Sequence, residues 1–593
     1  MKASNGVNIL GIHYGHNATV ALVKDGVLVF AMSEERFNRL KNSNGFPRLT
    51  LQHVYKNYVR PEQVDFAVIF QKDVAGYFEL KRNNFKSVRN FGAGNVNFNR
   101  QYSFLKHALS KIFIADKVRA WVGGLRRHFR AWKDSRSGES LAYFSKALGI
   151  PKEKILFSNH HASHAYACCF NLDANKKTLI FTMDGEGDGL SSTVNIYEQH
   201  QLKIISTNPV NVSIGYFFTE ITKLLGMTPN EHEFKVMGLA PYAKQERARK
   251  LYEQHKDLLT LDENLEFKSK VPTNKLEYYL LEKMYGHRFD TVAAFAQIFL
   301  EEKVLEWVSA WIKKTGIHDL ALSGGVFMSV KLNQKILELP EVNSLFVMPS
   351  GADESTALGA AAYGVLTHDK SAMLKAITDL YLGNEYSDAE VEKYLRENGC
   401  FEKYNIEKFG NDFSLEKKVA KLLAEGNVVA RFSGRAEWGA RALGNRSILA
   451  NPSSRDTVRV INEIIKNRDF WMPFASSITE EDQDRYLINP KKMPAPYMAI
   501  TFGTTELAQK HLSAAIHPYD FTCRPQVVYK DWSPSYHCLI SEFKNLTGIG
   551  AVLNTSLNLH GEPNVESPKD AIHTLEDSGL KFLAIGNFLV SKK

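Results

Sequence analysis

Two stretches of the chain share one pattern of apolar and small polar positions. Ile9 to Phe30 is ILGIHYGHNATVALVKDGVLVF, and Leu179 to Glu198 is LIFTMDGEGDGLSSTVNIYE. Each has β-rich runs around a tight turn of small and polar residues, a place where backbone N–H groups can hold phosphate oxygens. The pattern predicts two similar strand-turn-strand units that open two lobes, with a nucleotide between the lobes.

The following residues alternate between strand and helix patterns. Short β-rich runs that end in small or polar residues lie at Leu320–Ser323, Ser344–Ser350 and Asn427–Ser433, whereas Val292–Thr315 has helical spacing and Glu354–His368 is a helix of small residues. This alternation predicts an α/β fold. The charged stretch Tyr386–Gly399 marks the best boundary, and we divide the chain into residues 1–375 and 376–593.

Length and composition set broad limits on the class of protein. A chain of 593 residues with 44% hydrophobic residues is long enough for two to four globular domains. The five cysteines show no CxxC spacing, so neither a disulfide framework nor a structural zinc site is indicated. No run approaches the roughly 20 apolar residues of a membrane span, and no signal peptide is apparent. We expect a cytoplasmic protein without a membrane partner.

The net charge of +9 is concentrated in one stretch. Residues 81–133 contain thirteen Lys or Arg and a single acid, Asp116, so this stretch carries +12 and the remainder of the chain −3. We interpret residues 80–135 as a basic insertion rich in aromatic side chains. It is either a solvated face or lid, or a surface that binds an anionic substrate, a partner or nucleic acid. The localised excess does not by itself predict nucleic acid as the partner.

The segment Ser158–Ala165, SNHHASHA, contains the first candidate chemistry. If Ser158 or Asn159 caps a helix, His160 and His164 lie four apart on one face, a spacing that lets two imidazoles reach one metal. Capping and ordinary core or surface histidines are the alternative. Asp184 or Asp188 of MDGEGDG and Asp353 of PSGADEST, both expected in loops after β-rich runs, can complete the ligand set. Such mixed ligation suits Fe(II), Mn(II) or Zn(II).

Nucleotide recognition has to use something other than a Walker loop, because the chain has no GxxxxGK[ST] segment. Gly324 and Gly325 follow a predicted strand and precede a predicted helix. There the backbone can approach a ligand closely, and the helix N-terminus can face an anion. A purely structural turn explains a lone pair of glycines equally well, so the evidence comes from the order of the segments along the chain.

That order resembles one family. The segments GIHYGHNATVAL, HHASHA, DGEGDG, EFKVMGLAPY, SGGVFMSVKLN and GADESTALGAA, followed by GARALGNRSILANP, IKNRDFWMPFASSI, TCRPQVV and LNTSLNLHGEPNV, resemble those of the O-carbamoyltransferases of the NodU/CmcH type. The resemblance extends over nearly the whole chain except the basic insertion. About ten short motifs in the order of the family are far more specific than any one of them.

The resemblance implies a fold and a reaction. It implies an N-terminal duplicated domain of the actin and hexokinase (ASKHA, ribonuclease H-like) type, with ATP and a divalent metal, Fe2+ or Mg2+/Mn2+. It also implies a C-terminal α/β YrdC-like domain. There carbamoyl phosphate and ATP would give carbamoyl adenylate, and the N-terminal domain would pass the carbamoyl group to a hydroxyl of a small natural product or sugar. A homodimer is compatible with the resemblance.

The matching motifs supply candidate residues. The resemblance implies catalytic roles for His16, Lys466, Arg468, Arg524 and Ser556, contacts to ATP for Lys235, Gly324, Gly325, Asn333, Arg441, Arg446 and Asn554, and metal ligation by His160, His164, Asp184 and Asp353. The basic residues fit because the two phosphate substrates need fixed cations. His16 can accept the acceptor's proton, since imidazole titrates near neutral pH. Surface ion pairs and a structural histidine are the alternatives.

Some positions depart from the family pattern. The chain has Asn17, Ser329 and Met472 where Asp, Asn and Arg are usual, and it has His517-Pro518-Tyr519-Asp520-Phe521-Thr522 where the family has His-Val-Asp-Gly-Thr. These changes concern the acceptor contacts and the carbamoyl phosphate site. Two other functions remain open at this point: a tRNA-modifying carbamoyl or threonylcarbamoyl-type transferase, and a nucleotide-gated binding protein.

Overall fold

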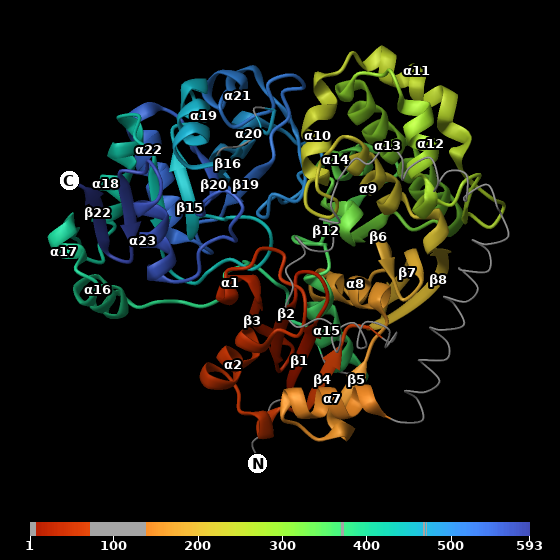
Figure 1. Ribbon diagram of the computed structural model, residues 1–593, viewed down its shortest axis with the longest axis horizontal. Helices are drawn as coiled ribbons and strands as arrows, with labels where there is room; N and C mark the ends of the chain where they lie inside the picture. The colour runs from red at the N-terminus through yellow and green to blue at the C-terminus, as the bar shows by residue number, and fades with distance from the viewer. Residues whose placement is uncertain (1–6, 72–137, 369–372, 467–468, 470) are drawn as a thin grey trace, which may run out of the picture.

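The computed structural model describes residues 7–71, 138–368, 373–466, 469 and 471–593 (Figure 1). The predicted basic insertion at 80–135 lies outside the described residues. In the part that is described, three large β-sheets form the framework. The mixed α/β fold predicted from the alternating pattern is confirmed.

The first lobe is built on a five-stranded sheet of order β3-β2-β1-β4-β5. Its strands are β1 Asn8–His13, β2 Thr19–Lys24, β3 Val27–Ser33, β4 Phe66–Ile69 and β5 Ile155–Phe157. β1 to β3 pair antiparallel, and β4 and β5 continue the sheet in parallel beyond β1. The helices of this lobe are α1 Glu35–Asn38, α2 Arg48–Asn57, α7 Glu139–Leu148, α8 His160–Cys168 and α15 Ser355–His368.

The second lobe repeats this topology, with sheet order β8-β7-β6-β11-β12. Its strands are β6 Thr178–Gly187, β7 Leu190–Glu198, β8 Gln201–Pro209, β11 Asp319–Ser323 and β12 Ser344–Val347. Again an antiparallel meander is followed by two parallel strands on the other side of its first strand. The two similar units predicted from the sequence therefore each begin a sheet of the same strand order.

Helices cover the second sheet, and a small hairpin lies beside them. The helices are α9 Ile214–Leu224, α10 Glu233–Leu239, α11 Gln245–His255, α12 Glu277–Met284, α13 Phe289–Thr315 and α14 Val330–Glu338, and the hairpin strands are β9 Leu259–Leu261 and β10 Phe267–Ser269. Along α13 most side chains are buried, including Trp307, which contacts the ring of Phe181 in β6. The helix predicted at Val292–Thr315 is confirmed and begins three residues earlier.

The small-residue helix α15 lies between β1 and α8 (Figure 1). A Cβ on Gly11 would lie 1.8 Å from the carbonyl oxygen of Ala357, and one on Gly359 would lie 1.6 Å from that of Ser163. Backbone therefore packs directly on backbone on both sides of the helix. This close approach explains why the segment is rich in Gly and Ala, as the pattern predicted.

The C-terminal unit, residues 373–593, contains a mixed eight-stranded sheet of order β13-β22-β21-β14-β15-β20-β16-β19. Its strands are β13 Tyr404–Lys408, β14 Val429–Phe432, β15 Arg446–Ala450, β16 Ala475–Thr479, β19 Pro525–Val528, β20 Ala551–Ser556, β21 Phe582–Ile585 and β22 Phe588–Lys592, with a separate pair β17 Leu487–Ile488 and β18 Gly503–Thr504. Its helices are α16 Asp388–Glu397, α17 Cys400–Lys403, α18 Ser414–Ala424, α19 Arg455–Ile461, α20 Gln483–Tyr486, α21 Glu506–His511, α22 Pro534–Thr547 and α23 Pro568–Glu576.

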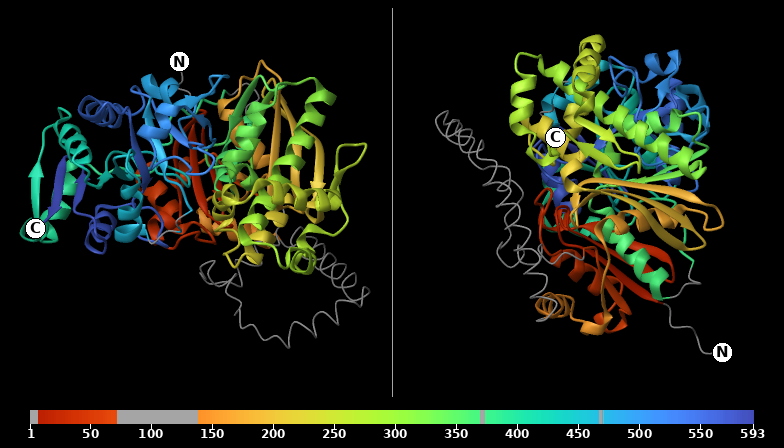
Figure 2. Two further views of the ribbon diagram at one scale, coloured as in Figure 1. Left: turned by 90° about the horizontal axis from the view of Figure 1, so that it is seen from above. Right: turned by 90° about the vertical axis from the view of Figure 1, so that its right-hand side faces the viewer.

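The C-terminal unit contacts both lobes. In Figure 1 and Figure 2 it lies beside the second lobe and above the first. Arg435 donates to the carbonyl oxygen of Val29 at 2.8 Å in the first lobe, and the Nζ of Lys491 donates to Leu339 and Val342 at 2.7 and 2.6 Å in the second. These hydrogen bonds connect the C-terminal unit to both lobes.

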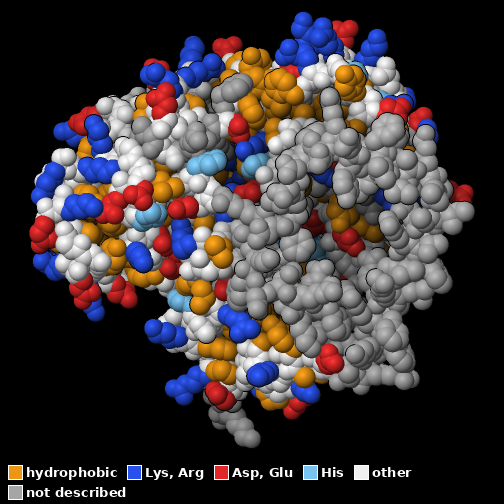
Figure 3. Space-filling model, viewed as in Figure 1, with side chains coloured by type: hydrophobic (Ala, Val, Ile, Leu, Met, Phe, Trp, Pro, Cys, Tyr) orange, Lys and Arg blue, Asp and Glu red, His pale blue; other side chains and the backbone are white. Residues whose placement is uncertain are grey.

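On the face shown in Figure 3, basic and acidic side chains are interspersed over the C-terminal unit. Within the described residues, none of the helices combines the length and apolar character that a membrane crossing needs.

Candidate metal centre and its surroundings

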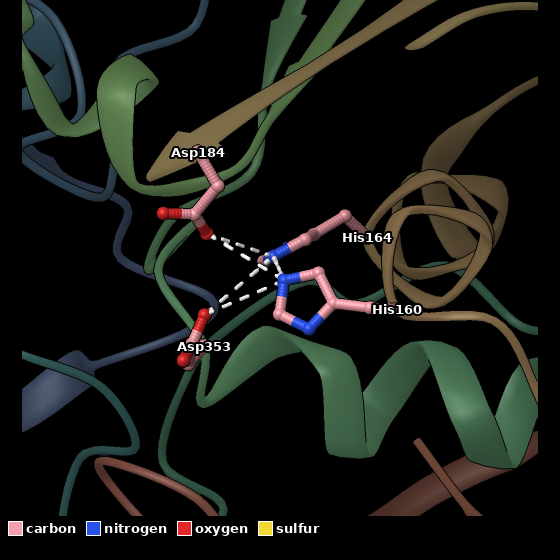
Figure 4. A group of neighbouring side chains, drawn as sticks. All are labelled: His160, His164, Asp184 and Asp353. Atoms are coloured by element: carbon pink, nitrogen blue, oxygen red, sulfur yellow. Dashed lines mark hydrogen bonds and ion pairs between the residues drawn. The ribbon is translucent and has the colours of Figure 1, made fainter. Parts of the chain in front are cut away.

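His160, His164, Asp184 and Asp353 meet at one point, and their ligand atoms all lie within 4.8 Å of one another (Figure 4). The two Nε2 atoms are 3.2 Å apart, and Asp184 Oδ2 lies 3.1 Å from the Nε2 of His164. Asp353 Oδ1 lies 3.7 and 3.8 Å from the Nε2 atoms of His160 and His164. The four residues that the sequence selected as metal ligands are therefore brought together.

The N-terminal turn of α8 positions the two histidines. Asn159 is the N-cap, and its side chain accepts the N–H of Ala162 at 3.1 Å. Asp188 accepts the N–H of His160 at 2.8 Å, so it supports the helix and is not one of the four grouped carboxylates and imidazoles. The ring of His160 packs against Gly187, where a Cβ would lie only 2.0 Å from it.

The carboxylates come from β6 and from the loop after β12, two strands of the second sheet that lie on either side of β11, with one correction to the sequence prediction. Asp184 does not follow the strand in a loop but lies within β6, where the pairing with β7 is irregular between Met183 and Gly187. Such irregularities redirect side chains. Gly324, at φ 104°, donates its N–H to Gly351 at 2.8 Å and so ties the turn after β11 to the loop that carries Asp353.

Buried negative charge controls the protonation of the site. Burial alone lowers the pKa of His164, but the carboxylates of Asp184 and Asp353 outweigh it and raise that pKa to about 9. Burial likewise opposes ionisation of Asp184, and His160 and His164 hold the pKa of Asp184 well below its usual range. The pair of carboxylates thus attracts positive charge into a buried position, which is a property of cation sites.

The donor set fits a divalent transition metal. Two imidazole nitrogens and two carboxylate oxygens are the mixed ligation that suits Fe(II), Mn(II) or Zn(II). The Nδ1 of His164 lies 3.0 Å from the hydroxyl of Ser355, which fixes the ring so that Nε2 faces the carboxylates. A second group, Glu480, Glu481 and His537, is more exposed, and its histidine already pairs with Glu481 at 2.9 Å.

Two further histidines lie beside the four ligands. The Nε2 of His13 donates to the carbonyl oxygen of His16 at 2.7 Å and lies 4.0 Å from Asp353 Oδ2. Burial lowers the pKa of His13 to about 4, so its ring is neutral at neutral pH. His16, the predicted base, has a buried Nε2 without a hydrogen-bond partner among the described residues. Sequence reasoning missed His13, although its spacing of three from His16 was visible.

The predicted nucleotide residues occupy different positions. A Cβ on Gly325 would lie 2.9 Å from Asp184 Oδ1, so the glycine pair borders the metal group. Lys235 and Asn333, by contrast, contact the C-terminal unit. Lys235 forms an ion pair with Asp469 at 2.8 Å, and the Asn333 amide donates to the carbonyl oxygen of Ala499 at 2.8 Å.

In the C-terminal unit, the side chains of Arg446 and Asn554 donate hydrogen bonds to other atoms of the protein. Arg446 is fully buried, stacks on Phe432 and donates to four backbone carbonyl oxygens, those of Asn384, Ser433, Gly434 and Asn445. The side-chain amide of Asn554 donates to Ala442 at 3.1 Å and to Ser477 at 3.0 Å. The Nε of Arg446 and the Oδ1 of Asn554 are buried without a hydrogen-bond partner among the described residues, and the predicted contacts of both residues to ATP stay predictions.

Of the other predicted cations of this unit, Arg441 and Arg524 are described with their side chains, and Lys466 and Arg468 are not. Arg441 forms no hydrogen bond or ion pair in the described part of the chain; burial lowers its pKa, and the Glu354 carboxylate opposes that. Arg524 is half-buried just before β19, and Ser556 donates to Asn558 at 2.6 Å. Arg468 lies outside the described residues, and Lys466 is described through its backbone alone.

A hydrogen-bonded chain joins the metal loop to the C-terminal unit. Asn17 donates to Glu354 at 3.4 Å, Ser350 donates to the same carboxyl, and Ala440 donates its N–H to Ser350 at 3.1 Å. Burial raises the pKa of Glu354 to about 7. No motif predicts these hydrogen bonds, because the residues that make them come from three distant segments.

Comparison with known proteins decides the family. The model described as Carbamoyltransferase N-terminus matches residues 8–362, and the one described as Carbamoyltransferase C-terminus matches residues 420–592. The chain belongs to the carbamoyltransferase family. This assignment confirms the resemblance predicted from the motifs and makes the protein a transferase enzyme.

Relatives cover nearly the whole chain. An uncharacterized protein of Methanocaldococcus jannaschii is 31% identical over 98% of this chain and 99% of its own length. Nodulation protein NolNO of Sinorhizobium fredii is 29% identical over 98% of this chain and 79% of its own. Among solved structures, full-length HypF in a phosphate- and nucleotide-bound form matches with a TM-score of 0.34 and 13% identity, over 62% of this chain and 47% of that one.

Proposed function

We propose that this carbamoyltransferase is an ATP-dependent O-carbamoyltransferase. It forms carbamoyl adenylate from carbamoyl phosphate and ATP, and transfers the carbamoyl group to a hydroxyl of a small natural product or sugar. The observation that carries the proposal is the grouping of two imidazoles and two carboxylates, with His13 between this group and the backbone of His16.

The proposal assigns the two steps to two domains, residues 1–375 and 376–593. The repeated strand order supports lobes of the actin and hexokinase type, which enclose a nucleotide. We assign adenylate formation to the C-terminal, YrdC-like domain. The family models support this division, because one matches within each proposed domain.

In the first step, water cleaves the phosphate from carbamoyl phosphate, which leaves phosphate and carbamate. A carbamate oxygen then attacks the α-phosphorus of ATP, the bond to pyrophosphate breaks, and carbamoyl adenylate forms. These species are strongly anionic, so fixed cations must hold them. Arg524, Lys466 and Arg468 are the residues to which we assign this task, with Ser556 as a neutral donor.

In the second step, the acceptor hydroxyl attacks the carbamoyl carbon and AMP departs. The Nε2 of His16, which has no hydrogen-bond partner among the described residues, takes the hydroxyl proton as the general base. A divalent metal held by His160, His164, Asp184 and Asp353 would supply Lewis-acid stabilisation of the phosphate charge. We assign backbone contacts to the nucleotide to Gly324 and Gly325, which border this group.

The test is incubation of the protein with carbamoyl phosphate, ATP, a divalent metal and a panel of hydroxyl-bearing acceptors. We expect AMP, pyrophosphate and phosphate to form, and ATP–pyrophosphate exchange to depend on carbamoyl phosphate. Exchange measures the first step without an acceptor, so it does not require the right acceptor to be known. No exchange with any of the metals would overturn the proposal.

Replacing His16 by asparagine separates the two steps. The His16→Asn variant is expected to lose about 100- to 10,000-fold in acceptor carbamoylation, the usual contribution of a general base, and to retain pyrophosphate exchange. Quantitative mass spectrometry of the product measures the loss. His318→Asn, at an exposed histidine, is the control. Equal transfer rates for the two variants would remove His16 from the mechanism.

A further inference from the structure

Lys331, on α14 of the second lobe, reaches across to the C-terminal unit. Its side chain is only 14% exposed. The Nζ atom forms an ion pair with Asp520 and donates a hydrogen bond to the hydroxyl of Thr522 at 2.9 Å. Both partners belong to the loop 517–522. One lysine of the N-terminal domain therefore holds a loop of the C-terminal unit at two points.

The loop is closed by its own hydrogen bonds. His517 donates its N–H to the carbonyl oxygen of Thr522 at 2.9 Å, and Phe521 donates to that of His517 at 3.0 Å. Asp520 accepts the N–H and the hydroxyl of Thr522 at 3.1 and 2.8 Å. The carboxylate that pairs with Lys331 is thus also the residue that closes the loop, so a change at Lys331 acts on the loop conformation.

The backbone of the loop needs this support. Phe521 has φ 54°, in the left-handed region that bulky residues disfavour. A strained residue persists only where surrounding contacts over-determine it. In this chain the contacts of Asp520 and Thr522 with Lys331 are among those that hold it.

The second lobe contacts the loop from another side as well. The Nε2 of His517 donates to the carbonyl oxygen of Gly238 at 3.0 Å, and the rings of Tyr242 and Tyr519 lie 4.2 Å apart. Burial acts to raise the pKa of Asp520, but Lys331 and His517 keep that pKa below its usual value. Lys331 therefore supplies positive charge to a half-buried carboxylate, which methionine at this position would not do.

The loop ends two residues before Arg524. Cys523, between them, pairs with Phe502 through hydrogen bonds of 2.9 Å in both directions, and β19 begins at Pro525. Arg524 consequently stands between a fixed strand and the loop that Lys331 holds. A displaced loop would move the backbone from which the guanidinium extends.

We propose that Lys331 is a positioning residue that fixes Arg524 for the activation of carbamoyl phosphate. The inference rests on the proposed function. Lys331 acts through Asp520 and Thr522 and touches no substrate. Through Lys331, helix α14 of the second lobe is therefore connected to the site of carbamoyl phosphate activation in the C-terminal domain.

The first experiment compares Lys331→Met with Lys331→Arg and with Lys335→Met. Lys335 lies on the same helix, is exposed and pairs with Glu338, so its replacement is the matched control. We expect Lys331→Met to lower kcat/KM for carbamoyl phosphate in pyrophosphate exchange by about 10- to 100-fold, the cost of a misplacement near 1 Å, with KM for ATP unchanged. Lys331→Arg should recover most of the loss, and Lys335→Met should match the wild type.

A double-mutant cycle tests the route. Asp520→Asn should reproduce the loss, and Lys331→Met/Asp520→Asn should lose no more than either single variant, because the residues act as one unit. Wild-type kcat/KM in Lys331→Met, or additive losses in the double variant, would overturn the proposal.

A second measurement does not depend on activity. Hydrogen–deuterium exchange at residues 517–524 should be faster in Lys331→Met than in the wild type, and unchanged in Lys335→Met. Unchanged exchange in Lys331→Met would overturn the role of Lys331 even if the enzyme were active. If hydrogen–deuterium exchange is faster in Lys331→Met but the wild type shows no ATP–pyrophosphate exchange, the proposed function is refuted. The contact by which Lys331 holds the loop would still stand.

Discussion

Replacing His164 by alanine is expected to lower acceptor carbamoylation by about 1,000-fold and to leave carbamoyl phosphate-dependent pyrophosphate exchange unchanged. A metal acting as a Lewis acid contributes several kcal/mol to a transition state, and about 1.4 kcal/mol corresponds to tenfold in rate. His164 lies closest to Asp184 and has the ring that Ser355 orients, so its loss removes the best-fixed ligand. Elemental analysis measures the loss of metal, and mass spectrometry of the product measures the loss of acceptor carbamoylation.

The neighbouring His161 provides the control. Its Nδ1 lies 2.9 Å from the hydroxyl of Thr182, so the ring does not join the four ligands, although it occupies the same helix and is equally buried. Burial lowers its pKa to about 3. His161→Gln should retain the metal and the transfer activity if it folds. Metal retained by His164→Ala at wild-type stoichiometry would show that the centre is assigned wrongly.

The part of this site that a sequence can predict is the part fixed by local geometry. His160 and His164 share a face because residues four apart do so in any α-helix, and Asn159 caps that helix because its side chain can reach the N–H three residues on. Asp184 and Asp353 were found because they follow or end β-rich runs. Their approach to the histidines depends on strand order across two lobes, and that order came only from the family resemblance.

The sequence does not predict the roles of residues that depend on contacts between distant segments. Ser355 orients His164, and Asp188, predicted as an alternative ligand, supports the start of α8 instead of joining the group. Arg446 and Asn554 occupy Gly- and Asn-rich motifs and also donate to backbone carbonyl oxygens of their own unit, so their predicted contacts to ATP stay predictions. A motif shows that a polar residue is needed; only the packed structure shows whether its donors face a ligand or a backbone carbonyl.

The same dependence on packing makes Gly359 the most sensitive position outside the ligands. Its Cα faces the carbonyl oxygen of Ser163, next to His164, and an added Cβ would stand 1.6 Å from that oxygen. The nearest atoms, from Ser163 and Ala167, belong to the backbone of α8, so they cannot rotate away as a side chain can. The helices α8 and α15 would have to separate, and with them the ligands His164 and Asp353.

Gly359→Ala is therefore expected to reduce both stability and metal affinity. Overpacking of a core costs about 1–3 kcal/mol or more, a large share of a total of about 5–15 kcal/mol, and should lower the melting temperature by about 5 °C or more. Gly364→Ala on the same helix is the control, because its Cβ would meet only methyl ends of Ile9 and Val68, at 2.8 Å, which can shift. Thermal unfolding and metal titration should place Gly359→Ala well below Gly364→Ala on both measures. Equal values would mean that α8 and α15 do not approach through their backbones, and the spacing of the metal ligands would then need another cause.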